Sequence, residues 1–66
     1  MNAQDRLLNF LQQNVPFDHY WHVRKQYGHE LTKQNILIIA QDCSHRVPWS
    51  RYTKFKKLYE EVENKV

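Results

Sequence analysis

The sequence predicts an all-α fold, a compact bundle of four short helices with a divergent helix-turn-helix in the C-terminal half. Apolar residues recur at helical spacing in four separate segments of the chain. One glycine and two prolines among 66 residues leave few hairpin turns, which argues against an all-β fold. A chain of this length forms one domain at most, so residues 1–66 are expected to fold as a unit.

The first helix is expected over residues 3–14. Asn2 is a suitable N-cap, and Asp5 places a negative charge in the first turn, where the helix dipole favours it. Pro16 prevents the helix from continuing. The predicted buried stripe consists of Leu7, Leu8, Leu11 and Val15.

A second helix is expected within residues 16–28, with Pro16 or Asp18 near its start. Gly28 suits the left-handed position that follows a helix C-terminus. Arg24 and Lys25 fall in the last two turns, where the dipole favours cations. The predicted shared face consists of Phe17, Tyr20, Trp21 and Tyr27.

The third helix is expected to begin after Thr32, a good N-cap flanked by Leu31 and Ile36 at the two positions of a hydrophobic staple. A β-strand through residues 35–41 is the competing interpretation, because short apolar runs are ambiguous. The capping pattern favours a helix, and apolar residues on its sides predict that it is central. Its predicted buried residues are Ile36, Ile39, Ala40 and Cys43, with Leu37 and Ile38 beside them.

A break is expected over residues 44–48, followed by a fourth helix that starts at Trp49 or Ser50 and runs almost to the end of the chain. Its apolar residues are spaced 3, 4, 3, 4, which is typical of a buried stripe. The stripe consists of Tyr52, Phe55, Tyr59, Val62 and Val66. On a helical wheel, one flank of the stripe carries Arg51, Lys54 and Lys57, and the other carries Lys56.

Basic residues are concentrated in one block. Residues 32–57 hold six basic residues against one acidic residue, whereas residues 58–66 hold one against three. In the fourth helix the cations therefore precede the anions, against the helix dipole. Each cation in a first turn costs about 0.3–1 kcal/mol, but an approaching phosphate reverses the sign of this effect.

This pattern predicts that the last two helices bind double-stranded DNA in a regulatory or accessory role, because the second helix of a helix-turn-helix enters the major groove by its N-terminal end. A homodimer would supply two such helices. The turn is longer than usual and lacks the common glycine, hence the description as divergent. The candidate nucleic-acid-binding residues are His45, Arg46, Ser50, Arg51, Thr53, Lys54 and Lys57.

Two competing interpretations stay open. A solvated face with no partner is one, since Lys56 with Glu60 and Lys57 with Glu61 are i,i+4 pairs. A small adaptor or inhibitor that docks on a larger protein is the other, because tryptophan and tyrosine are enriched at protein–protein hot spots. The candidate protein-binding residues are Trp21, Tyr27 and Trp49.

No enzyme, metal or cofactor is expected. Cys43 lies on an apolar stripe although His45 is near, and the chain has no glycine-rich phosphate loop or placed acidic pair. The spacing of His19, His22, Cys43 and His45 matches no tight zinc pattern. A single cysteine, no signal-peptide pattern and an apolar run too short for a bilayer predict a cytoplasmic protein without membrane contact.

Overall fold

The computed structural model describes residues 2–27 and 30–64, and within them it contains α-helices and short 3₁₀ turns but no strand. The elements are α1 (Ala3–Asn14), α2 (Phe17–Tyr27), α3 (Lys33–Cys43), the 3₁₀ turns η1 (Ser44–Arg46) and η2 (Trp49–Arg51), and α4 (Tyr52–Asn64). The prediction of an all-α bundle of four short helices is confirmed. The alternative of a strand over residues 35–41 is wrong, because these residues lie within α3.

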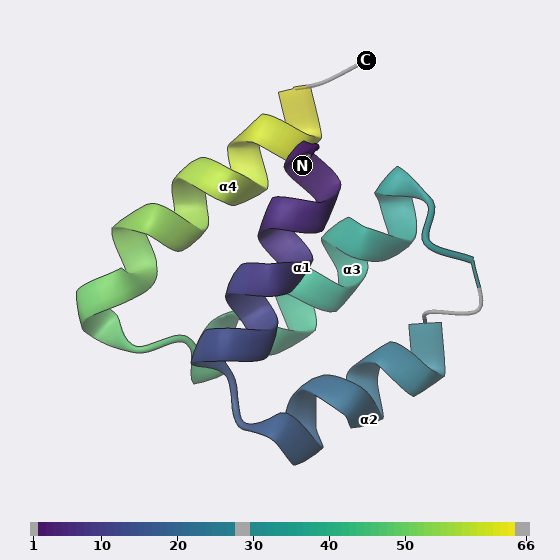
Figure 1. The fold of residues 1–66 in the computed structure, drawn as a ribbon, viewed down its shortest axis with the longest axis horizontal. Coiled ribbons are helices and arrows are strands. Elements are labelled where there is room, and N and C mark those ends of the chain that lie inside the picture. Colours follow the sequence, from purple (N-terminus) through teal and green to yellow (C-terminus); the bar gives the residue numbers. More distant parts are fainter. Residues whose placement is uncertain (1, 28–29, 65–66) are drawn as a thin grey trace.

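The helices form two antiparallel pairs (Figure 1). α1 lies against α4, α2 lies against α3, and the members of each pair run in roughly opposite directions. α3 also contacts α1, α4 and η1, so the helix predicted to be central touches every other α-helix. This arrangement brings the start of α1 beside the end of α4, although they are far apart in the sequence.

Two of the helices start with the predicted side-chain caps. The Asn2 Oδ1 atom accepts a hydrogen bond from the backbone N–H of Asp5 at 2.8 Å. The Thr32 Oγ1 atom accepts one from the backbone N–H of Asn35 at 3.2 Å. Each cap of this kind stabilises the folded chain by about 1 kcal/mol. The glycine cap predicted at Gly28 lies outside the described residues.

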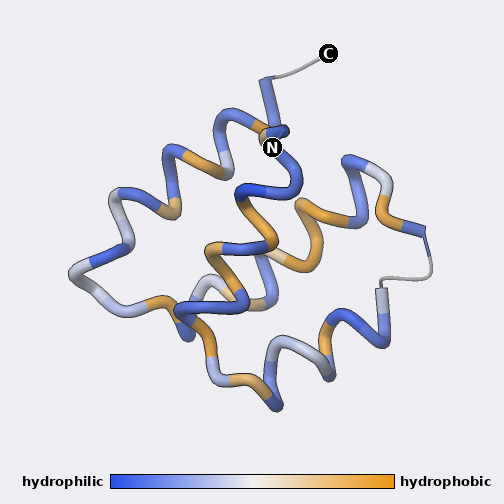
Figure 2. The backbone as a smooth tube through the Cα atoms, viewed as in Figure 1, coloured by the Kyte–Doolittle hydropathy of each residue, from blue (hydrophilic) through white to orange (hydrophobic). Residues whose placement is uncertain are grey.

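One hydrophobic core joins the four helices, and Figure 2 shows the apolar stretches of α1 and α3 meeting in the middle of the molecule. The stripes predicted for α1 and α3 are fully buried, and Leu37 and Ile38 are half-buried on the sides of α3. Sequence reasoning omitted Phe10, which is buried and packs against α4 through the ring of Phe55 at 6.3 Å. The buried side chains of α1 and α3 are Ala3, Leu7, Leu8, Phe10, Leu11, Ile36, Ile39, Ala40 and Cys43.

The face predicted for α2 is partly wrong. Tyr20 is buried as expected, but its buried companion is Val23 rather than another aromatic residue. Phe17 and Trp21 are 72% and 41% exposed, and Tyr27 is half-buried against the core. α2 packs mainly on α3, so only a narrow strip of its surface is covered, and its bulky rings at the edges remain in contact with water.

The start predicted for the fourth helix is also wrong. Residues 49–51 form the 3₁₀ turn η2, and the α-helix begins at Tyr52. The backbone N–H of Arg51 donates to the carbonyl of Pro48 at 2.9 Å, which closes this tighter turn. A tight turn after a proline therefore takes the place of the first turn of α4.

The buried face of α4 is centred on Phe55, Leu58 and Val62, whereas Tyr52 and Tyr59 are only half-buried at its margin. The sequence prediction left out Leu58. Because α4 packs on α1 as well as on α3, its covered face is turned toward α1 relative to the predicted stripe. Val66, the last predicted member, lies outside the described residues.

Candidate nucleic-acid interface

The connection between α3 and α4 follows a fixed path through two 3₁₀ turns. The backbone N–H of Val47 donates to the carbonyl of Ser44 at 3.2 Å and closes η1. The hydrogen bond from Arg51 to the carbonyl of Pro48 closes η2 in the same way. Between the two turns, the side chain of Val47 is buried in the core. This anchor holds the connection against the bundle while the residues on both sides of it face water.

All the predicted nucleic-acid-binding residues are exposed, and they occupy three consecutive elements. η1 carries His45 and Arg46, η2 carries Ser50 and Arg51, and α4 carries Thr53, Lys54 and Lys57. With 100° per residue, Thr53 and Lys57 lie on the side of α4 opposite its buried face, and Lys54 lies nearer its edge. The structure thus presents the basic side chains along one continuous stretch of chain and along the first half of α4.

The edge of α4 that bears Lys54 borders α1. Lys54 lines a shallow groove between the two helices, together with Asn9 and Gln13 of α1. Lys57 lines the adjoining hollow, and Arg6 lines both of them. Sequence reasoning missed this contribution of α1, because the polar residues of α1 and α4 are distant in the chain and only their helix pairing brings them together.

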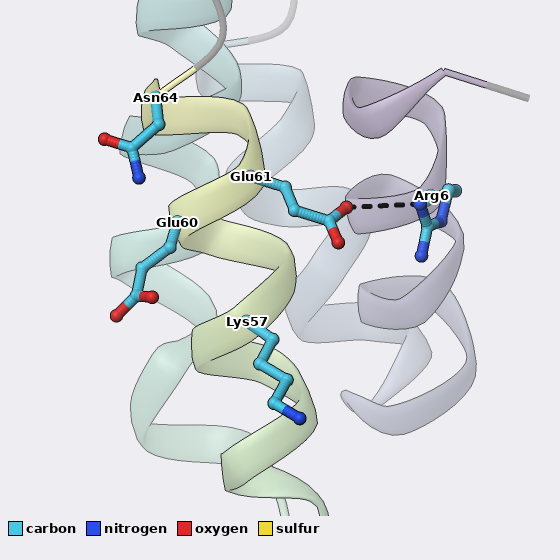
Figure 3. A pocket seen from close by; sticks show the side chains of 5 residues that line it. All are labelled: Arg6, Lys57, Glu60, Glu61 and Asn64. Carbon is cyan, nitrogen blue, oxygen red and sulfur yellow. Dashed lines mark ion pairs between the residues drawn. The ribbon is translucent and has the colours of Figure 1, made fainter.

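Figure 3 shows how the charged side chains around this hollow are arranged. Arg6 of α1 reaches across to Glu61 of α4, and the Arg6 Nη1 and Glu61 Oε2 atoms are 3.2 Å apart. The side chains of this pair are 51% and 43% exposed, so the bridge contributes at most about 1 kcal/mol. Lys57 extends toward the N-terminal part of α4, away from Glu60 and Glu61.

The lysines of α4 are not paired with its glutamates. Among residues 2–27 and 30–64, no ion pair joins Lys56 to Glu60 or Lys57 to Glu61, and the carboxylate of Glu61 is directed to α1 instead. The i,i+4 pairs that would explain the charges without a partner are therefore not formed in this part of the chain. The cations of the first half of α4 face solvent at the positively polarised end of the helix.

An exposed indole lies beside the basic residues. Trp49 is 92% exposed, and its ring centroid lies 6.3 Å from that of Tyr52. Tyr52 in turn contacts Phe55 of the core at 5.4 Å. Trp49 and Tyr52 form the aromatic wall of a shallow hollow whose other lining residues are Ser44 and His45. The connection therefore displays a large apolar ring between its arginines.

The residues predicted for protein binding are not brought to one surface feature. Trp21 lies on α2 beside Phe17, with ring centroids 6.1 Å apart, and the guanidinium carbon of Arg24 lies 5.1 Å from the Trp21 ring. Trp49 belongs to η2, and Tyr27 is packed against the core. Sequence reasoning assigned Phe17 to the buried face and so missed a ring of α2 that is 72% exposed.

Within the described parts of the chain, no three potential metal ligands among the histidine, cysteine, aspartate and glutamate side chains come together. His19 and His45 meet edge to face with ring centroids 5.3 Å apart, and His19 Nε2 lies 3.3 Å from the carbonyl oxygen of Asp42. Burial, with a smaller contribution from Asp42, raises the pKa of the Cys43 thiol to about 11. The thiol is therefore protonated at neutral pH and unsuited to act as a nucleophile.

No protein-family model, curated protein or solved structure matches this chain. In the described residues, no helix combines the length and apolar character needed to cross a membrane.

Proposed function

We propose that this chain binds double-stranded DNA through the connection between α3 and α4 and the first half of α4, used as a divergent helix-turn-helix. In this arrangement the N-terminal end of α4 meets the major groove, and the residues of η1 and η2 meet the phosphates. The role is regulatory or accessory, in a reducing compartment such as the cytoplasm, which the single free cysteine supports.

The observation that carries the proposal is the unpaired cationic start of α4. Lys54 lies in the first turn and Lys57 in the second, both exposed and without an ion-pair partner among the described residues. No acidic residue occurs between Asp42 and Glu60. A polyanion at this position would interact favourably with the helix dipole and with the lysines together, which offsets the cost of placing cations there.

The divergence from a common helix-turn-helix lies in the turn. Its two 3₁₀ turns span residues 44–51, whereas the usual turn has about three or four residues. The buried side chain of Val47 supports the proposal despite this length, because it fixes the connection against the core. A fixed connection sets the backbone positions of Arg46 and Arg51 before DNA is bound, which lowers the entropy cost of binding.

Binding of the protein to a labelled random-sequence duplex, followed by fluorescence anisotropy, tests the proposal. We expect affinity to fall steeply between about 50 and 200 mM salt, because each neutralised phosphate contributes about 0.9 to the log–log slope. Lys54→Gln should reduce that slope by about 0.9. The matched control is Lys25→Gln, which removes the same charge from an exposed position in α2 and should leave the slope unchanged.

A second candidate is a protein-binding adaptor, favoured by the exposed pair of Phe17 and Trp21 on α2. Contiguous exposed aromatic rings are the kind of residue that anchors protein interfaces. Under this alternative, Trp21→Ala or Trp49→Ala abolishes capture of the partner and salt has little effect on its affinity. Absence of any salt-sensitive duplex binding by the wild-type chain would leave this candidate in place of the first.

A further inference from the structure

We infer that the hollow lined by Ser44, His45, Trp49 and Tyr52 is a stacking site for an unpaired nucleobase. The inference rests on the proposed function, since it adds base recognition to the phosphate-binding surface. It names a ligand class that duplex binding alone does not require: DNA in which a base is extruded, bulged or single-stranded.

The exposed ring of Trp49 has an aromatic neighbour, the ring of Tyr52. The ring of Tyr52 in turn contacts the ring of Phe55, which is buried in the core and only 4% exposed. The turn η2 that carries Trp49 is closed by the hydrogen bond from Arg51 to the Pro48 carbonyl. The indole therefore extends from a hydrogen-bonded backbone turn with most of its surface in water, which leaves a ring face open for stacking with an incoming base.

The hollow suits a polar-edged aromatic ring in its volume and its chemistry. Its volume is about 390 Å³, and ligand sites in proteins have volumes of about 300–1,000 Å³. Two aromatic rings form one side, and a hydroxyl and an imidazole complete the lining. The Ser44 hydroxyl donates to the carbonyl of Gln41 at 2.8 Å, so its oxygen is left to accept a hydrogen bond from an exocyclic amino group.

His45 has a partner that restricts its ring. The His19 ring from α2 meets it edge to face at 5.3 Å, and His19 Nε2 lies within hydrogen-bond distance of the Asp42 carbonyl. Through this contact between His19 and His45, α2 packs against one side of the hollow. A base that enters the hollow thus meets an imidazole whose position is limited by the bundle.

The surrounding charge favours a nucleic acid over other aromatic ligands. Arg46 follows His45 directly, and Arg51 lies between Trp49 and Tyr52, so both are exposed cations next to residues that line the hollow. Lys54 follows in the first turn of α4. A nucleotide carries its phosphate on the same unit as its base, and the arginines can contact the phosphate while the base stacks.

The test uses fluorescence of Trp49 in a Trp21→Phe protein, where it is the remaining tryptophan of the two in the sequence. The probes are a short single-stranded oligonucleotide, a fully paired duplex, and the same duplex with one extra unpaired base. We expect quenching of Trp49 by the single strand and the bulged duplex, and tighter binding to the bulged than to the paired duplex. Stacking on the indole predicts that Trp49→Ala weakens bulged-duplex binding about 5- to 150-fold.

Two variants keep the test specific. Trp49→Phe preserves an aromatic face and should retain most of the affinity for the bulged duplex. Trp21→Phe alone should bind like the wild type, because Trp21 lies on α2. Circular dichroism checks that each variant is folded, and Trp49 is so exposed that its replacement should leave the fold intact.

The outcomes separate this inference from the proposed function. Salt-sensitive duplex binding without quenching, and without a preference for the unpaired base, overturns the stacking site and leaves duplex binding in place. Quenching by the single strand without duplex affinity supports the stacking site and overturns the proposed function. No binding to any of the three probes overturns both, and would be the result if the hollow receives an aromatic side chain of a protein partner.

Discussion

α2 and α4 place their charges in opposite ways. α2 carries Asp18 in its first turn and Arg24 with Lys25 in its last, as the helix dipole favours. α4 has no acidic residue in its first turn and no basic residue in its last turn. Lys54 occupies the first turn, where a negatively charged residue would stabilise the helix. One helix of the same small bundle follows the electrostatic rule, and the other opposes it.

The two helices also differ in how they are packed. α2 leaves Phe17 and Trp21 exposed, whereas α4 buries Phe55, Leu58 and Val62 against α1 and α3. α4 is thus stabilised by tertiary packing, which is the main source of helix stability in proteins, and not by its local charges. Because the packing of Phe55, Leu58 and Val62 stabilises α4, we expect the basic residues at its start to contribute little to folding, and we therefore connect them with binding.

The largest difference in stability is expected between variants that remove one aromatic ring from α4 and one from α2. Phe55→Ala removes a buried ring that packs against Phe10, Tyr52 and Tyr59, and should lower the free energy of unfolding by about 3–5 kcal/mol. Phe17→Ala removes a ring that is 72% exposed and should change it by less than about 0.5 kcal/mol. Thermal or urea unfolding of the two variants measures the contrast. Equal losses of stability would show that α2 and α4 are not packed as described.

An intermediate effect concerns α3, against which both helices pack. The Cys43 thiol has its pKa raised from 9.0 to about 11 by burial, so the native state keeps the proton that the unfolded chain loses first. Its contribution to stability is complete below pH 9 and is lost as pH rises toward about 11. The unfolding temperature of the wild type should therefore fall more steeply over this range than that of Cys43→Ala. Parallel profiles would contradict the burial of an ionisable thiol here.

The smallest change in stability is expected from reversing one charge near a helix end, in α4 and in α2. Lys54→Glu places an anion in the first turn of α4 and should stabilise the protein by about 0.3–1 kcal/mol at low salt. Lys25→Glu places an anion in the last turn of α2 and should destabilise it by a similar amount. Added salt should shrink both changes, because exposed charges are screened. If the two variants shift stability in the same direction, the charge pattern of α4 is unrelated to its dipole.

Sequence reasoning succeeded where the determining interactions are local. The capping side chains of Asn2 and Thr32 bond to backbone groups three residues away, so they set the starts of α1 and α3. The periodic stripe of α1 likewise identified its buried side. These features depend on neighbours within one or two turns, which the sequence displays directly.

It failed where the outcome depends on which helices meet. Leu58 rather than Tyr59 lies at the centre of the buried face of α4, because α4 packs on α1 as well as on α3. Phe17 is exposed because α2 contacts α3 over only a narrow part of its surface. The closing of residues 49–51 into a 3₁₀ turn was missed for a related reason, since Val47 is anchored in the core just before it. The sequence did identify the exposed basic residues, but not the side chains of α1 beside them.

Measuring the free energy of unfolding and the DNA affinity in one variant separates a role of the basic residues in folding from a role in binding. The variant combines Arg51→Gln, Lys54→Gln and Lys57→Gln. Its free energy of unfolding should be unchanged or slightly higher, because these exposed side chains lie outside the core and their charges oppose the dipole of α4. The same variant should bind duplex DNA more weakly, with a log–log salt slope reduced by about 0.9 for each phosphate that it no longer neutralises. Unchanged duplex affinity and salt slope in this variant would contradict the claim that the start of α4 is basic in order to meet a polyanion.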